Sequence, residues 1–160
     1  MDISALKIIS GGQTGADRAA LDWAIEQGIP HGGWCPAGRK AEDGKVPDRY
    51  QLTELPGSRS YRSRTKANVR DADATLIISL APALTGGSLL TVKFAEQMGK
   101  PSLHVHPGFD WRTDLQTWLR GVAIHTLNVA GPRASREPAV GQFTHEVLSE
   151  LLYASLRDPR

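Results

Sequence analysis

Residues 7–15, Lys7-Ile8-Ile9-Ser10-Gly11-Gly12-Gln13-Thr14-Gly15, and the stretch that follows them decide the fold. The apolar run at Ile8 and Ile9 predicts a short strand that stops at two glycines. From residue 16 to residue 27, apolar side chains recur at the spacing of an amphipathic helix, and Gly28 is typical of the residue after a helix. The segment therefore predicts a strand, a tight turn and a helix.

The same order of elements recurs along the chain. Residues 74–80 form the strongest strand pattern, which we expect to be the central strand, and Thr85-Gly86-Gly87-Ser88 opens the next helix. Residues 29–60 give only weak strand signals, at 31–35 and 50–55. The other expected elements are a helix at 61–72, a strand at 102–106, a helix capped by Asp110, a strand at 123–129 and a last helix at 138–156.

This alternation predicts an α/β protein with one domain over residues 1–160. Parallel strands joined by right-handed crossovers form an open, doubly wound, mainly parallel sheet with helices on both faces. Strand-to-helix loops of such a sheet meet at its carboxyl edge, where ligands bind. The loops expected there are residues 10–15, 79–88, 106–110 and 128–137.

The charge balance excludes several classes of function. The formal net charge of +2 is too small to predict binding to nucleic acid or to a membrane surface, so any anion site must be local. The N-terminus has no leader-like pattern and no apolar run is long enough to cross a membrane, so we expect a cytoplasmic protein. Cys35 is the only cysteine, and we expect it to be a buried, idle thiol.

The first glycine-rich loop is the first candidate anion site. Its backbone N–H groups at Gly11, Gly12, Gln13, Thr14 and Gly15, together with the Thr14 hydroxyl, would hold a phosphate at the positive end of the following helix. In the alternative, Thr14 caps that helix and Asp17 completes a capping box. Arg18 would then offset the charge of Asp17, which otherwise lies close to the expected phosphate.

The second strand-to-helix loop, residues 79–88, is a second candidate anion site by the same argument. Ser79, its first residue, is one of the candidates. Its glycines again precede a helix, although Ser88 could instead be the N-cap. Residues 55–70 contain five basic residues and no acid, most of which we expect to be solvated. Arg133 and Arg136 differ because they fall on a loop at the expected edge, where guanidinium groups bind phosphate oxygens. The second set of candidates is Ser79, Thr85, Gly86, Gly87, Ser88 and Arg133.

Catalytic signatures are missing from the sequence. It has no Gly-x-Ser-x-Gly elbow, no His-Glu-x-x-His motif and no phosphate loop of the nucleoside-triphosphatase type. His104 and His106 lie at strand spacing, which suits ordinary packing better than metal binding or proton transfer. Trp34, Tyr50 and Tyr61 could stack on a planar ring, or simply belong to the core. We assign no catalytic residue and no metal ligand.

Several strings of sequence resemble the molybdenum carrier family. The resemblance extends from about residue 7 to about residue 132 and covers most of the chain. Its motifs are residues 10–17 (SGGQTGAD), 31–36 (HGGWCP) with Gly38-Arg39, 41–44 (AEDG), Arg64-Thr65 with Asn68-Val69, 73–77 (DATLI) and 128–133 (NVAGPR).

The resemblance implies a Rossmann-like, lysine-decarboxylase-like fold, as a circularly permuted relative of the cytokinin-activating phosphoribohydrolases. It further implies binding of molybdenum cofactor, a phosphate-bearing pterin, by a homo-oligomer, a tetramer, with molybdoenzymes or cofactor-synthesis proteins as partners. The chain departs from the phosphoribohydrolase motif by placing Lys93 where that motif has Glu.

Two functions therefore remain open at this stage. The first is a non-catalytic carrier that stores and protects molybdenum cofactor, motivated by the motif set and by the missing catalytic acid. The second is a nucleotide-binding sensor or a nucleotide-processing enzyme, because the same loops suit a nucleoside phosphate equally well.

Overall fold

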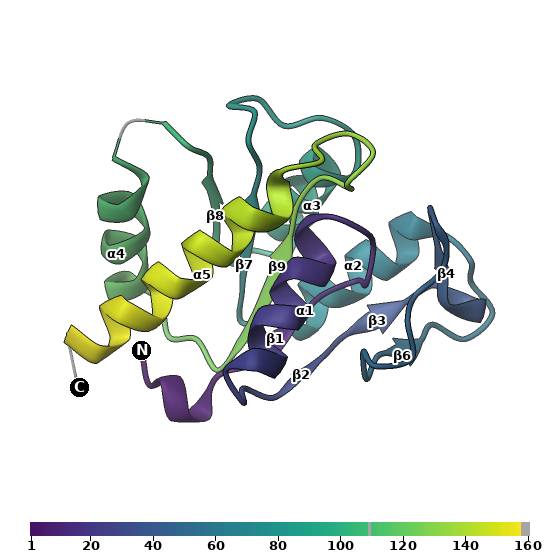
Figure 1. The fold of residues 1–160 in the computed structure, drawn as a ribbon, viewed down its shortest axis with the longest axis horizontal. Helices are drawn as coiled ribbons and strands as arrows, with labels where there is room; N and C mark the ends of the chain where they lie inside the picture. The colour runs from purple at the N-terminus through teal and green to yellow at the C-terminus, as the bar shows by residue number, and fades with distance from the viewer. Residues whose placement is uncertain (109, 158–160) are drawn as a thin grey trace.

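A five-stranded parallel sheet forms the centre of the computed structural model, which describes residues 1–108 and 110–157 (Figure 1). Its two longest strands and the first strand are mainly apolar and contain several β-branched residues, as expected where helices cover both faces. The predicted open, doubly wound α/β architecture is confirmed. In spatial order the strands are β2 (His31–Gly32), β1 (Lys7–Ile9), β9 (Thr126–Ala130), β7 (Ala74–Ile78) and β8 (Ser102–Val105).

The last strand of the chain, and not β7, lies at the centre of the sheet. β9 pairs with β1 through Ile8 and Leu127 and with β7 through Leu76 and Val129. The prediction that residues 74–80 form the central strand is therefore wrong. Every residue of β7 is buried, but β7 owes this to helices on both faces and to pairing with β8 on its other side.

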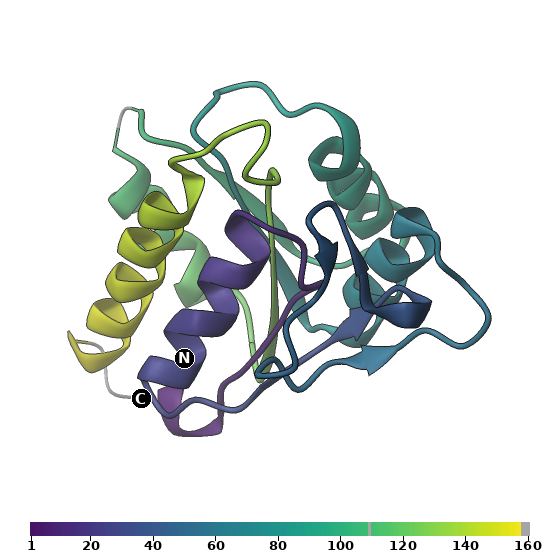
Figure 2. The same ribbon diagram turned by 45° about the vertical axis from the view of Figure 1, so that its right-hand side comes forward.

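Helices cover both faces of the sheet (Figure 2). On one face lie α1 (Ala16–Glu26), α4 (Trp111–Gly121) and α5 (Val140–Arg157), and on the other lie α2 (Tyr61–Asp71) and α3 (Gly86–Gln97). Trp111 packs edge to face against Phe143, with 5.5 Å between ring centroids, so this tryptophan belongs to the core. None of the described helices combines the length and the apolar character that a membrane crossing requires.

Three helix starts differ from expectation. Asp110 precedes α4 with φ of +58°, and its side chain makes no capping hydrogen bond. Helix α5 begins at Val140, so Pro138 lies just outside it. Thr85, and not Ser88, is the N-cap residue of α3. The helices themselves occur where the apolar periodicity placed them.

Residues 33–60 form a small subdomain beyond β2 (Figure 2). It contains the parallel pair β3 (Trp34–Cys35) and β6 (Thr53–Glu54), and the antiparallel hairpin β4 (Lys40–Ala41) and β5 (Gly44–Lys45). The Arg39 guanidinium donates to the carbonyls of Val46, Pro47 and Tyr50 at 3.0, 2.7 and 2.8 Å, and so holds this segment together. The weak strand signals were right for β2, β3 and β6, and the hairpin was not predicted.

Cys35 lies in the apolar cluster under this subdomain. It packs with Leu21, Ala41, Val46 and Tyr50, and burial raises the pKa of its thiol. A buried thiol with a raised pKa is a poor nucleophile, so its packing agrees with the expectation of an idle side chain.

We predict that Gly15→Ala destabilises the fold by about 2 kcal/mol or more. Gly15 has φ of +84°, and a Cβ there would lie 2.4 Å from the Pro132 carbonyl oxygen. Gly57→Ala is the matched control, because Gly57 has φ of +70° but no atom within 4 Å of the added Cβ. The control should lose only the backbone term, about 1 kcal/mol. Urea unfolding measures both, and equal losses would contradict the packing argument.

Candidate functional site

A cavity of about 580 Å³ opens at the carboxyl edge of the sheet, above β1, β9 and β7. Its size falls in the range of sites for small molecules and cofactors. Four arginines line it, two from α2 and two from the segment after β9: Arg62, Arg64, Arg133 and Arg136. Two carboxylates, Asp17 and Glu137, also line it. The cavity is therefore polar and carries an excess of positive charge.

Backbone N–H groups of the first glycine-rich loop and of the helix start after it are hydrogen-bonded to acceptors within the protein. The N–H of Gln13 donates to Asp17 Oδ2 at 3.2 Å, and the N–H of Thr14 donates to Gln13 Oε1 at 3.1 Å. The N–H of Ala16, at the start of α1, donates to the Pro132 carbonyl at 3.2 Å. The protein itself thus supplies acceptors at the positive end of α1, where a phosphate was expected.

Thr14 ties three segments together. Its hydroxyl donates to Glu42 Oε1 in the β4–β5 turn and accepts the N–H of Ala134 at 3.0 Å. Glu42 Oε2 in turn accepts the Ser135 hydroxyl at 2.6 Å. The alternative role of Thr14 as a helix cap is wrong, because Gly15 is the N-cap residue and no side chain caps it. Its hydroxyl is also already engaged on both its donor and acceptor sides.

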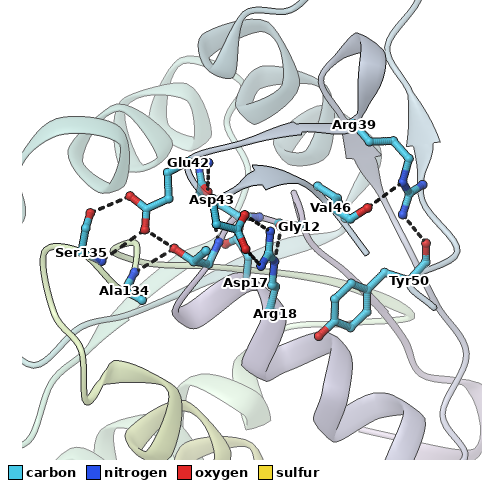
Figure 3. A network of polar contacts seen from close by, with 12 residues as sticks. Gly12, Asp17, Arg18, Arg39, Glu42, Asp43, Val46, Tyr50, Ala134 and Ser135 are labelled. Atoms are coloured by element: carbon cyan, nitrogen blue, oxygen red, sulfur yellow. Dashed lines mark hydrogen bonds and ion pairs between the residues drawn. The ribbon is translucent and has the colours of Figure 1, made fainter. Parts of the chain in front are cut away.

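Arg18 is held by the same β4–β5 turn (Figure 3). Its guanidinium binds Asp43 through two hydrogen bonds of 2.5 and 2.7 Å and donates to the Gly12 carbonyl at 2.9 Å. Arg18 is therefore paired with Asp43, and its expected effect on the charge of Asp17 is present but smaller than that of Arg64. This bidentate pair holds the hairpin against the glycine loop.

Asp17 is paired with Arg64. Arg64 Nη1 lies 3.5 Å from Asp17 Oδ2 and donates to the Gly11 carbonyl at 2.8 Å. Both side chains are about nine-tenths buried. Burial raises the pKa of Asp17, while Arg64 and the Gln13 N–H act in the opposite direction. The expectation that the basic residues of 55–70 are mostly solvated is wrong for Arg64, whose helical face, shared with Ala67 and Asn68, packs inward.

The second glycine-rich junction presents an open helix start to the cavity. Thr85 is the N-cap residue of α3, and its side chain makes no capping hydrogen bond. A Cβ on Gly87 would meet no atom within 4 Å, so ligand atoms could approach its backbone. The Arg136 guanidinium lies beside Gly86, 3.7 Å from where a Cβ of Gly86 would be. A helix N-terminus and a guanidinium therefore face the same space.

Ser79, His104 and Glu137 fix the loop between β7 and α3. The Ser79 hydroxyl donates to the Ala81 carbonyl at 2.7 Å and lies 2.6 Å from His104 Nε2. Glu137 accepts the N–H groups of Leu80 and Ala81 at 2.6 and 3.3 Å. Burial lowers the pKa of His104, as does the neighbouring His106, whereas Glu137 raises it. Within residues 1–108 and 110–157, no three His, Cys, Asp or Glu side chains gather as a metal site would require.

The structure divides the expected site residues into two groups. Those that line the cavity are Gly11, Gln13, Ser79, Thr85, Gly87, Ser88 and Arg133. Those outside it are Gly12, Thr14, Gly15, Arg18 and Gly86, and the first four of these serve the packing of the loop against its neighbours.

Sequence reasoning missed most of the residues that α2 and β9 contribute to the cavity. They include Arg62, Arg64, Thr65, Asn68 and Asn128. The two carboxylates of the cavity, Asp17 in α1 and Glu137 after β9, were also not predicted as site residues. One available signal was the spacing of Arg64 with Ala67 and Asn68, which places a charged residue on the inward face of a helix.

The fold and the cavity define an α/β protein with a cavity of the size of a small-molecule site at the carboxyl edge of a parallel sheet. Residues 8–152 match the model of the circularly permutated YpsA SLOG family, and the chain belongs to this family. No curated protein matches the chain significantly.

A solved structure supports the same assignment. The chain is 52% identical to a protein from Syntrophus aciditrophicus SB named "putative molybdenum carrier protein", whose crystal structure was determined at 1.45 Å resolution. The match has a TM-score of 0.86 and covers 92% of this chain and 96% of the other. The resemblance to the molybdenum carrier family is thereby confirmed.

We predict that Glu42→Gln lowers stability at neutral pH by about 1 kcal/mol, because it weakens a charged hydrogen-bond network. The Ser135 and Thr14 hydroxyls hold the pKa of Glu42 below its usual 4.5. A lowered folded pKa stabilises the fold above the unfolded pKa, and this contribution is lost as the pH falls through the folded value. The two proteins should therefore differ in urea unfolding at pH 7 and converge as the pH falls below the lowered pKa of Glu42 in the folded protein.

Asp48→Asn is the control for Glu42→Gln, because the Asp48 side chain is 87% exposed and its ion pairs are 3.6 and 3.9 Å long. Such a surface carboxylate should contribute little at either pH. A Glu42→Gln deficit that stayed unchanged throughout an acid titration of unfolding would show that shape, and not charge, gives Glu42 its effect.

Proposed function

We propose that the protein is a non-catalytic carrier that binds molybdenum cofactor, with the phosphate of the cofactor at the N-terminus of α3. The observation that carries this proposal is the open start of α3 beside the Arg136 guanidinium, within a cavity lined by four arginines. A cytoplasmic location and delivery to molybdoenzymes or cofactor-synthesis proteins belong to the same proposal.

The position of the phosphate follows from the electrostatics of the two helix starts. The first N–H groups of a helix have no acceptor within the helix and attract anions. At α1 the Pro132 carbonyl and the Asp17 carboxylate already supply acceptors or negative charge. At α3 the N-cap side chain supplies none, and Arg133 and Arg136 line the same cavity. We therefore place the phosphate at α3 and not, as first expected, at residues 11–15.

A carrier is favoured over a phosphoribohydrolase because α3 has a lysine at the position of that motif's acidic residue. Lys93 stands where that motif would place its acid, and its side chain is exposed and outside the cavity. Glu137 is a carboxylate near the start of α3, but its two oxygens already accept the N–H groups of Leu80 and Ala81. The name of the Syntrophus relative supports the same choice.

The alternative is a nucleotide-binding sensor or a nucleotide-processing enzyme. The observation that favours it is the Ser79 hydroxyl in the cavity wall, 2.6 Å from a histidine nitrogen, because paired hydroxyl and imidazole groups can transfer protons. A nucleoside monophosphate also suits a cavity of this size.

We predict that the protein retains molybdenum cofactor released from a molybdoenzyme through gel filtration, and that Arg136→Gln weakens this retention at least about tenfold. Loss of one hydrogen bond to a charged group has about this effect. Lys93→Gln is the matched control, because it removes one positive charge from α3 outside the cavity. If the protein turned over a nucleoside monophosphate and did not retain the cofactor, the carrier proposal would be contradicted and the nucleotide-processing enzyme supported.

We further propose a homo-oligomer, a tetramer. Trp111 does not add to an outer apolar surface, because this residue lies in the core. Tyr153 and Leu156, near the end of α5, are 52% and 66% exposed and give the final helix an uncovered apolar surface. We expect sedimentation at micromolar concentration to show a closed assembly. A species of only 17.4 kDa would contradict this prediction.

A further inference from the structure

A carboxylate lies in the wall of a cavity that is otherwise suited to anions. Asp17 is 7% exposed and lines the cavity together with the four arginines. Its hydrogen bonds, from the Gln13 N–H and from Arg64, both use Oδ2. The buried Ser10 hydroxyl lies beside this carboxylate and acts to lower its pKa. Neither the Gln13 N–H nor Arg64 uses Oδ1, and a carboxylate oxygen can accept two hydrogen bonds, so Oδ1 keeps a lone pair for a ligand at the wall of the cavity.

The second carboxylate of the cavity is different. Glu137 uses both oxygens for the N–H groups of Leu80 and Ala81, so its role in positioning the loop is complete. In Asp17, one oxygen positions the loop, and the other can still accept a hydrogen bond from a ligand. A buried acceptor left over in this way suits a ligand N–H group.

Gln13, next to Asp17, supplies the complementary donor. Gln13 Oε1 accepts the N–H groups of Thr14 and Glu42 at 3.1 and 2.9 Å, which fixes the orientation of the amide. The Nε2 group donates to no described residue and is not sealed from solvent, and Gln13 lines the cavity. An amide donor and a carboxylate acceptor therefore line the same cavity, on two residues that are joined by the hydrogen bond from the Gln13 N–H to Asp17.

The spacing of the sheet separates this pair from the phosphate position. Asp17 and Gln13 follow β1, whereas Gly86 and Gly87 follow β7, and β9 lies between these strands. Two strand spacings amount to about 10 Å. A ligand with a phosphate at one end and a ring with both C=O and N–H groups at the other would reach both sites.

We propose that Gln13 and Asp17 bind the amide edge of a 2-amino-4-oxopyrimidine ring, the ring that guanine and pterins share. Gln13 Nε2 donates to the ring carbonyl, and Asp17 Oδ1 accepts the ring N–H and amino groups. The position of the ring relative to α3 rests on the proposed function, whereas the donor and acceptor pair stands on its own contacts. Adenine has the opposite pattern of donors and acceptors on this edge, so the pair discriminates against it.

The test compares GMP with AMP by calorimetry on the folded wild-type protein. GMP should bind at least about tenfold more tightly, the factor expected for a hydrogen bond to a charged group. Equal affinities for GMP and AMP would overturn the inference. Dihydroneopterin monophosphate has the same ring edge as GMP and should also bind more tightly than AMP, and its rank against GMP tells a pterin site from a guanine site.

Two substitutions test the residues themselves. Asp17→Asn keeps an oxygen for the Gln13 N–H and Arg64 but presents a donor to the ligand, so the preference for GMP over AMP should disappear. Gln13→Glu keeps an oxygen for Thr14 and Glu42 and removes the donor, so GMP should bind about tenfold more weakly. Asp43→Asn is the matched control, because Asp43 binds Arg18 outside the cavity, and its preference for GMP should be that of the wild type. A preference for GMP that survived in both cavity variants would overturn the assignment.

Two further ligands separate this inference from the proposed function. Ribose 5-phosphate carries the phosphate without the ring, and guanosine carries the ring without the phosphate. Binding of ribose 5-phosphate with equal affinities for GMP and AMP would overturn the inference and leave the phosphate site at α3 standing. Equal affinities for guanosine and GMP, with AMP weaker, would support the ring site and contradict the phosphate site.

Discussion

The buried ion pair between Asp17 and Arg64 is the interaction on which the geometry of the site depends. It links the β1–α1 loop to α2, since Asp17 accepts the Gln13 N–H and Arg64 donates to the Gly11 carbonyl. Removing two charges from water is costly, and such a pair is retained only where further hydrogen bonds satisfy both groups. Here these partners are the backbone groups of the glycine loop, so the loop conformation and the ion pair stabilise each other.

This constraint explains why two similar loops have different roles. Both follow a parallel strand and precede a helix, and both contain paired glycines. In the first loop, acceptors come from Asp17, from the β4–β5 turn through Glu42, and from the Pro132 carbonyl. In the second, the start of α3 has no capping side chain and has guanidinium groups nearby. The difference lies in the neighbours of each loop and not in its own residues.

Local sequence patterns were enough to predict the layers of the fold and the edge that holds the site. Ile8 and Ile9, the glycines after them and the apolar spacing of α1 are short-range signals, and β7 and α3 gave signals of the same kind. The place of β9 between β1 and β7 could not be found in this way, because a buried apolar strand looks alike at every internal position of a parallel sheet.

The roles of individual site residues depended on contacts between distant segments. Thr14 meets Glu42 from 28 positions away and Ala134 from 120, and no local pattern indicates either contact. Arg64 was part of a basic run that suggested a solvated surface, and its burial follows from which face of α2 meets the sheet. The loops expected at 10–15, 79–88 and 128–137 do line the cavity, whereas no described residue of the loop at 106–110 does, and residue 109 of that loop lies outside the described residues. The partner of each side chain was not predictable.

The central place of β9 also brings residues from the end of the chain into the site. A Cβ on Gly131 would lie 2.1 Å from the Ile78 carbonyl oxygen and 2.6 Å from the Ala16 Cβ, so only glycine lets the chain leave β9 between β7 and α1. Beyond this point the Pro132 carbonyl accepts the Ala16 N–H, and the chain then presents Arg133 and Arg136 to the cavity. The same crossing thus occupies the positive end of α1 and supplies cations near the start of α3. Because both effects come from one segment of six residues, the site cannot form until the last strand has entered the sheet.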